Sequence, residues 1–382
     1  MKTETRIIPD ISSIDERDWA QLDHQDNPFL SRAFLSALEE SGSVNASTGW
    51  QPHHLAVLQD GQLTAFAPTY IKTHSHGEFV FDWAWADAYH RHGLDYYPKL
   101  LTAIPYSPVT GPRLLIRKGH PDSVSLRKIL MRLAADECEQ QEFSSWHCNF
   151  TGAEDEKALT RAALLERRDL QFHWFNRDYP SFDDFLQQLR SRKRKNIRRE
   201  RRQVQDAGIH FEWKTGREMS RQDLDFVYRC YSNTFHAHGN HAALQPAFFR
   251  LLSDGLADRL QVSLAKRNDS PLAMSLFLTG GGRLYGRYWG CVEEVPGLHF
   301  EAAYYQGIEY CIEHGIEVFE SGAQGEHKIS RGFIPSRTRS WHLVRHEGFR
   351  SAIAEYLKRE SHWLGGYHDE LMQHNPYHRD ST

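Results

Sequence analysis

Several residues able to move protons and hold charged groups follow an apolar, strand-like segment late in the chain. The small-residue turn Ser321–Gly325 leads directly into Glu326, His327 and Lys328, and Arg331 comes shortly after. Loops that follow strands are where binding sites form in open α/β sheets. We therefore predict Glu326 and His327 as catalytic candidates, and Lys328 and Arg331 as substrate contacts. The alternative is a tight turn with solvated charges.

A second group of candidates opens the amphipathic segment Leu298–Glu313, which Gly315 is expected to end as a helix. His299 and Glu301 lie in its first turn, and a carboxylate or imidazole in a cleft is the usual group to take a proton from an ammonium. Glu301 at this position also suits the helix dipole without any catalytic role. Tyr304, one turn on, is a candidate substrate contact.

A third candidate is the segment from Tyr285 to Trp289, predicted as a strand. Gly286 permits a close backbone approach, and a splayed strand can aim a backbone N–H at a developing oxyanion. Tyr285 and Arg287 are therefore predicted to be catalytic and Trp289 to contact substrate. The alternative is that glycine and aromatic residues alternate here only to pack.

The segment Ser181–Gly208 is predicted as a connecting helix, which Ser181 can cap. Its middle is strongly basic, and Arg194, Arg198 and Arg201 are candidates for holding the phosphates of a tRNA acceptor stem, a nucleotide-linked sugar or CoA. The alternative is a solvated helix. Because the whole chain has a formal net charge of -4, a general DNA- or RNA-binding role is not expected.

Two residues of the first half are further candidates. Asp82 and Trp85 fall in Phe79–Trp85, which is predicted as a strand, and could line a groove for an acceptor. Packing of an aromatic strand is the equal alternative.

Metal binding and membrane insertion are not expected. The five Cys are scattered without a C-x-x-C pair, and the run His236–His241 fits no zinc signature. No apolar stretch approaches the ~20 residues of a membrane span, and no signal-peptide core is present. We expect a cytoplasmic protein that binds no metal or resident cofactor.

The order of expected elements indicates a duplicated α/β architecture. The first half is expected to begin with a helix from Asn27–Ser31 onward, a hairpin around Asp60 and Gly61, and a strand. Two helices, 96–103 and 126–138, and the strand 172–177 are expected to follow. The second half repeats the hairpin (261–266 and 271–278), a strand (283–290), a helix (298–313) and a strand (316–320). We predict an N-terminal domain over 1–180, a basic connecting helix over 181–208 and a C-terminal domain over 209–382.

Several motifs in this order resemble the bacterial FemAB-like family, labelled peptidoglycan biosynthesis/recognition. They are Phe81–Tyr89, Tyr96–Leu100, Pro108–Leu114, Tyr285–Gly290, Leu298–Tyr305 and Gly322–Lys328. The resemblance implies two tandem GNAT-like acyltransferase domains. It also implies transfer of an aminoacyl group from aminoacyl-tRNA to an amine-bearing acceptor, such as the peptide of a peptidoglycan precursor.

Two other functions remain open on the same fold. One is acyl-CoA-dependent N-acetyl transfer, although the interval Cys291–Gly297 is acidic and lacks the glycine-rich loop that cradles the pyrophosphate of CoA. The other is ligand binding without catalysis.

Overall fold

The computed structural model describes residues 2–237, 239–323 and 325–378, which form two compact units. Unit 1 comprises residues 1–169 and 337–366, and unit 2 comprises 170–336 and 367–382. The chain passes between the units within three elements, β9 (Leu165–Phe175), β15 (Ile334–Val344) and α12 (Glu347–Gln373). The units therefore interleave along the chain, whereas the sequence analysis expects consecutive domains.

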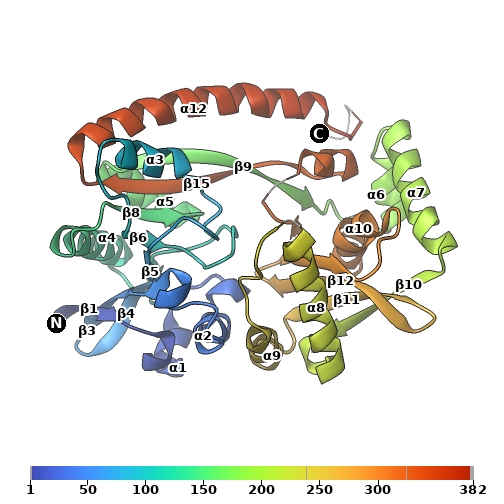
Figure 1. Cartoon of the computed structure of the whole chain (residues 1–382), viewed down its shortest axis with the longest axis horizontal. Helices are drawn as coiled ribbons and strands as arrows, with labels where there is room; N and C mark the ends of the chain where they lie inside the picture. The colour runs from blue at the N-terminus through green and yellow to red at the C-terminus, as the bar shows by residue number, and fades with distance from the viewer. Residues whose placement is uncertain (1, 238, 324, 379–382) are drawn as a thin grey trace. The chain divides into compact units, whose positions relative to one another are not determined.

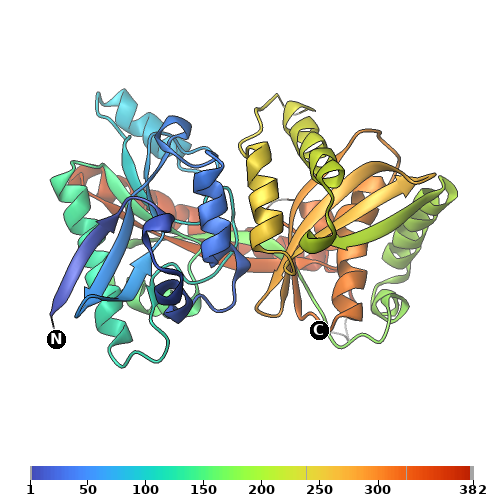
Figure 2. The ribbon, with the colours of Figure 1, turned by 90° about the horizontal axis from the view of Figure 1, so that it is seen from below.

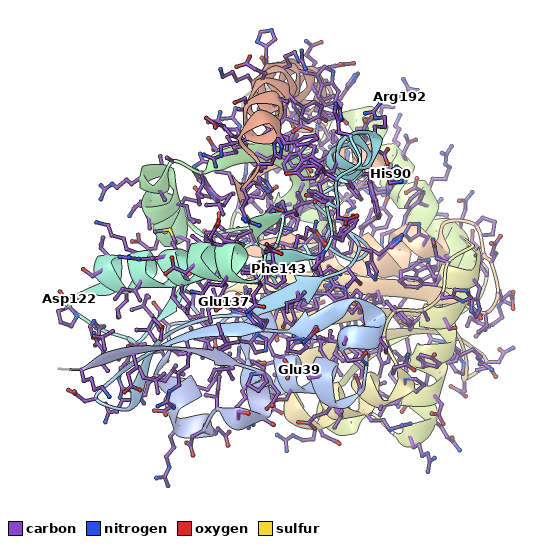
Figure 3. The ribbon with its side chains drawn as sticks, turned by 60° about the vertical axis from the view of Figure 1, so that its left-hand side comes forward. Glu39, His90, Asp122, Glu137, Phe143 and Arg192 are labelled. Carbon is purple, nitrogen blue, oxygen red and sulfur yellow. The ribbon has the colours of Figure 1, made fainter. Side chains whose placement is uncertain are left out.

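Unit 1 contains two sheets, ordered β1-β3-β4-β7 and β15-β8-β6-β5-β2. Helix α4 carries the buried Leu126 and Leu130, which pack with Trp146 and Trp341 in the main core of the unit. Figure 3 shows the two ends of α4, marked by Asp122 and Glu137. The elements of unit 1 are β1 (Thr3–Ile8), α1 (Glu16–Gln21), α2 (Arg32–Glu40), β2 (Trp50–Pro52), β3 (His54–Gln59), β4 (Gln62–Ala67), β5 (Thr69–Lys72), α3 (Trp83–Arg91), β6 (Lys99–Thr102), β7 (Leu115–Ile116), α4 (Ser123–Gln140), β8 (Ser145–Asn149) and α5 (Ala153–Leu159).

Unit 2 is built on one sheet with the order β10-β11-β12-β13-β14-β9. Helices α8 and α9 lie on one side of this sheet, and α7 and α11 on the other (Figures 1 and 2). The elements of unit 2 are α6 (Phe182–Gln187), α7 (Ser191–Asp206), β10 (Ile209–Thr215), α8 (Arg221–Ala237), α9 (Pro246–Gly255), β11 (Leu260–Arg267), β12 (Ser270–Gly280), β13 (Arg283–Cys291), α10 (Leu298–Phe300), a π-helical turn (Glu301–Tyr305), α11 (Gln306–Glu313), β14 (Val318–Glu320) and a 3₁₀ helix (Glu326–Arg331).

Both units repeat one arrangement of strands and helix. In unit 1, β6 is followed by α4 and by β8, which is parallel to β6 and antiparallel to β15. In unit 2, β13 is followed by α10–α11 and by β14, which is parallel to β13 and antiparallel to β9. The last strand of each unit is thus contributed by the other half of the sequence. This exchange explains why the units interleave, and the repeated arrangement confirms the predicted tandem GNAT-like α/β fold.

Most predicted elements are confirmed, and both hairpins form at left-handed turns, at Asp60-Gly61 and at Asn268-Asp269. Three assignments are wrong. Phe79–Trp85 is not a strand: helix α3 begins at Trp83 and buries Trp85 and Tyr89, four residues apart on one face. The segment 96–103 is not a helix, because its core is β6, a short strand buried on both faces. The single connecting helix is also wrong, since 181–208 forms α6 and α7.

A close approach of α8 to β13 fixes the sheet of unit 2 against that helix. A side chain at Gly290 would place its Cβ 2.1 Å from the carbonyl oxygen of Cys230 on α8. Thr234 reinforces the contact, since its hydroxyl donates to the carbonyl of Trp289 at 2.8 Å. Only glycine therefore permits this spacing between the helix and the strand.

Candidate functional site

A small pocket opens in unit 2 beside the middle of β13. Its cavity volume is about 90 Å³. Its walls come from β12, β13, the helical segment 298–305 and the residue after β14. They are Ser275, Leu276, Phe277, Gly286, Arg287, Tyr288, Trp289, His299, Ala303, Tyr304 and Ser321.

The pocket lies where two parallel strands separate. β13 pairs with β14 from Arg283 to Tyr285, the latter opposite Glu320, and the pairing goes no further. One residue later β13 is bulged, because Phe277 faces Gly286 and Leu276 faces Tyr288, which leaves Arg287 as the extra residue. A bulge redirects the strand locally and is common next to active sites. Here the residues at the bulge, Gly286 to Trp289, line the pocket.

The helix opposite β13 departs from α-helical geometry where it borders the pocket. The π-helical turn Glu301–Tyr305 inserts one extra residue per turn and brings Ala303 and Tyr304 into the wall. The Tyr304 hydroxyl and His327 Nε2 are hydrogen-bonded at 2.9 Å. This contact ties the 3₁₀ helix after β14 to the pocket.

Lys328 is a buried amine beside two residues of the pocket wall. Its side chain lies near the ring of Tyr304, and its Nζ donates to the carbonyls of Ser321 and Gly322, both at 2.9 Å. Gly322, with φ +91°, gives the turn the left-handed conformation that brings these carbonyls round Lys328. No carboxylate among the described residues forms an ion pair with it. Burial lowers the pKa of Lys328 to about 7.

The hydrogen-bonding pattern suits the neutral form of this amine. A neutral amine has two N–H groups, which the two carbonyls accept, and its lone pair remains to take a proton. A protonated Lys328 would bury a third N–H and an unpaired charge. The group is therefore poised near neutral pH, as a general base must be.

Two hydroxyl groups of the pocket wall have no hydrogen-bond partner within the described protein. They are the Oγ atoms of Ser275 and Ser321, and both atoms are buried. Ser275 as a whole is 2% exposed. Because a buried polar atom without a partner is costly, a polar group bound in the pocket would supply the partner that these hydroxyls lack.

Glu301 and Arg201, both predicted to act on substrates, instead bind each other. Arg201 Nε lies 3.1 Å from Glu301 Oε1, and its Nη2 lies 2.7 Å from Glu309 Oε2. Gln306 donates to Glu301 at 2.9 Å. Burial raises the pKa of Glu301, while Arg201 opposes that shift. The arrangement fastens α7 to the helix over the pocket and leaves Glu301 fully engaged.

Arg331 makes a comparable structural contact. It pairs with Glu200 of α7 at 3.0 Å, and its guanidinium lies 3.4 Å from the ring centre of Phe300. Glu200 also accepts from the hydroxyl of Tyr305. Arg331 therefore holds α7, the 3₁₀ helix and the pocket helix together.

The two predicted histidines lie at the pocket and beside it. His299 stacks on Trp289 with ring centres 5.4 Å apart. Although part of His299 is exposed, desolvation of its ring, with smaller contributions from His327 and nearby cations, lowers its pKa to about 4. It is therefore neutral at pH 7. The pKa of His327 is also lowered by burial. Glu326 is exposed and accepts from the hydroxyl of Tyr367.

The family assignment follows from the whole chain rather than from this pocket alone. The family model described as peptidoglycan biosynthesis/recognition, FemAB-like, matches residues 10–379. The chain belongs to the FemAB-like family. No curated protein sequence matches the chain.

Solved structures similar to this FemAB-like chain agree on the fold. FemX has a TM-score of 0.54 and 12% identity over 93% of this chain and 100% of its own. A conserved protein of unknown function from Bacteroides thetaiotaomicron has a TM-score of 0.52 and 9% identity, over 90% and 100%. The C-terminal domain of a lysylphosphatidylglycerol synthetase candidate from Agrobacterium fabrum has a TM-score of 0.51 and 10% identity, over 88% and 93%.

The remaining predicted residues lie outside the pocket of this FemAB-like protein. Tyr285 is buried in β13, and Arg194 lies on α7. Arg198, also on α7, pairs with Asp183 at 2.9 Å. In unit 1, Asp82 and Trp85 are both buried rather than lining an open groove.

Asp82 belongs to a buried polar network of unit 1 that the sequence analysis missed. It accepts from Lys99 and from the Tyr96 hydroxyl, the latter at 2.6 Å. Burial alone would raise the pKa of Asp82, but the Lys99 ammonium holds it below its usual range. Glu78 pairs with the same ammonium at 2.8 Å. Of the three charged residues in this network, only Lys99 gives a local signal in the sequence. A lysine rarely occurs within a short run of buried, mostly apolar residues such as β6.

Two pocket residues were also missed, Ser275 and Ser321, because a serine within or just after an apolar strand carries no distinctive signal. Two residues of the segments discussed above lie outside the described residues: Gln324, in the predicted site loop, and His238, in the histidine run that is not expected to bind metal. Within the described part of the chain, no group of three His, Cys, Asp or Glu side chains could hold a metal ion. The helices described there include none that is both long and apolar enough to cross a membrane.

Proposed function

We propose that the protein transfers an aminoacyl group from aminoacyl-tRNA to a primary amine of an acceptor, such as a peptidoglycan precursor or a peptide. The observation that carries this proposal is the pocket at the separated strands β13 and β14, with the buried amine of Lys328 beside it. Membership of the FemAB-like family and a fold shared with FemX support acyl or aminoacyl transfer. Because the proposed donor is made in the cytoplasm, we place the activity there.

The acceptor amine attacks the ester carbonyl of the donor directly, without a covalent enzyme intermediate. A new C–N bond forms as the carbonyl oxygen gains negative charge. The backbone of the bulge from Arg287 to Trp289 provides an N–H to that oxyanion. Collapse of the tetrahedral intermediate then breaks the C–O bond to the ribose.

Proton transfer completes the reaction. Neutral Lys328 accepts the proton that the attacking nitrogen loses, through one intervening water molecule, and the same proton passes to the departing ribose oxygen. This role replaces the proton relay expected for Glu301, whose carboxylate is occupied by Arg201. The hydroxyls of Ser275 and Ser321 hold polar atoms of the aminoacyl group.

The loop after β13 disfavours CoA as the donor. Residues 291–297 contain Glu293 and Glu294, and Glu293 pairs with Arg267 at 2.8 Å. An acidic loop repels a pyrophosphate where a CoA-dependent enzyme needs backbone N–H groups to receive it.

The decisive experiment is single-turnover transfer from a mixed pool of charged tRNAs, with an acyl-CoA pool in parallel. Amide product from charged tRNA supports the proposal and identifies the amino acid. Product from acyl-CoA alone would refute aminoacyl-tRNA as the donor. Binding of both pools without any product would refute the proposal that the protein is an enzyme.

A further inference from the structure

Four basic side chains form an exposed stripe along α7. They are Arg192, Lys195, Arg199 and Arg202, all exposed. Their spacing of three, four and three residues places them on one face of a helix. At 1.5 Å per residue the stripe is ~15 Å long. Figure 3 shows the side chain of Arg192 on the outside of the ribbon.

The stripe differs from two neighbouring arginines of α7, which form ion pairs with carboxylates. Arg198 is paired with Asp183, and Arg201 with Glu301 and Glu309. Glu200, the one acidic residue between positions 190 and 202, is engaged by Arg331. Within the described residues, no carboxylate lies at ion-pair distance from any of the four stripe cations.

The stripe is therefore concentrated positive charge on a chain whose formal net charge is -4. Charge left unpaired on one face marks a surface for an anionic partner. The protein makes its internal ion pairs with the residues beside the stripe, so these four cations are not needed to hold α7 in place.

The chemistry of the helix favours RNA over a membrane surface. A helix that binds lipid inserts an apolar face. The apolar residues of α7, Ile197 and Val204, are each 1% exposed and face the protein core. Three of the four stripe residues are arginines, whose guanidinium groups bind phosphate oxygens in a bidentate manner. At roughly 3.4 Å per phosphate along one strand, a ~15 Å stripe spans about four phosphates.

We propose that the stripe on α7 binds the sugar-phosphate backbone of an RNA. This inference rests on the proposed function and deepens it, since it names the surface that engages the RNA portion of the donor. Binding at this surface neutralises about four phosphates and carries no base readout, so it is independent of sequence.

The test measures binding of deacylated tRNA, which requires no chemistry, by fluorescence anisotropy from 50 to 200 mM salt. Four phosphate contacts predict a slope of log affinity against log salt of about -3, so affinity falls roughly 50- to 150-fold over that range. The variant R192Q/K195Q/R199Q/R202Q is expected to bind weakly, with the slope reduced by about 3. The control R221Q/R250Q removes two exposed arginines elsewhere on unit 2 and is expected to bind like the wild type.

Two results would overturn the inference. One is an unchanged affinity and slope in the quadruple variant, provided that its thermal unfolding matches the wild type. The other is binding to anionic lipid vesicles through the stripe without binding to tRNA.

Transfer from a short aminoacyl ester that lacks the RNA separates the two proposals. If the quadruple variant retains it but loses transfer from charged tRNA, both stand. If no donor yields product while the stripe still governs tRNA binding, only the proposed function fails.

Discussion

Replacement of Lys328 by methionine tests the chemistry that the pocket supports. With a pKa of about 7, the amine is neutral in ~9% of molecules at pH 6 and ~91% at pH 8, so kcat/KM should rise about tenfold over this interval in the wild type. Lys328→Met removes the base and should lower kcat/KM by a factor on the order of 10² to 10⁴. Lys328→Arg keeps a cation that does not release its proton at these pH values, and is expected to be equally impaired.

The same substitution has a signature in stability that does not depend on activity. Because the folded pKa of Lys328 is lower than the unfolded pKa of ~10.4, the unfolded state binds one more proton between these values. Unfolding therefore takes up a proton in this window, and stability rises with pH and is lost as the pH falls toward 7. The wild type should gain about 1.4 kcal/mol per pH unit relative to Lys328→Met.

Urea unfolding at pH 7.5, 8.5 and 9.5 measures this difference, and Lys128→Met, which removes an exposed lysine of α4, is the matched control. A constant difference between wild type and Lys328→Met across these pH values would refute the lowered pKa. A Lys328→Met enzyme that keeps its rate and its rise with pH would refute the assignment of the base.

Three further substitutions test how the structure holds the site and the units. Arg201→Met should destabilise unit 2 by about 3–5 kcal/mol in urea unfolding, because the buried Glu301 carboxylate loses its cationic partner, and the added change Glu301→Gln should recover part of the loss. Gly290→Ala forces Cβ to within 2.1 Å of the Cys230 carbonyl and should cost about 1–3 kcal/mol, seen as a lower Tm. Lys99→Met leaves two buried carboxylates unpaired and should lower the stability of unit 1 by about 3–5 kcal/mol, whereas an unchanged Tm would contradict the ion pairs described there.

Local signals in the sequence were enough to predict the elements whose conformation depends on residues adjacent in the chain. The two hairpins form because Asp60-Gly61 and Asn268-Asp269 accept left-handed conformations between apolar strands. Ser181 caps α6 through the backbone N–H of Asp184, as its position predicts.

The sequence misled where tertiary packing decides. The aromatic residues of Phe79–Trp85 alternate as in a strand, yet Phe81 and Trp83 are 48% and 40% exposed. Trp85 is buried, as is Tyr89 one turn later in helix α3. β6 reads as the start of a helix because four residues buried on both faces have no period. The exchange of β9 and β15 depends on pairings between distant segments, which no local pattern encodes.

The candidate site shows the same division. Two of the segments singled out in the sequence, the strand with Gly286 and the cluster around Lys328, lie at or beside the pocket. The sequence could not assign roles within the predicted segments, because Glu301 is occupied by an arginine 100 residues earlier in the chain. Likewise, the lowered pKa of Lys328 comes from burial, which only the fold reveals.

The most direct test of the central claim is a single-turnover reaction of the wild type and Lys328→Met with labelled aminoacyl-tRNA and an amine acceptor. The account predicts that the wild type moves the label into an amide of the acceptor and that Lys328→Met does so at least a hundredfold more slowly. Label held covalently on the protein, or no transfer from any charged tRNA under conditions where tRNA binds, would contradict it.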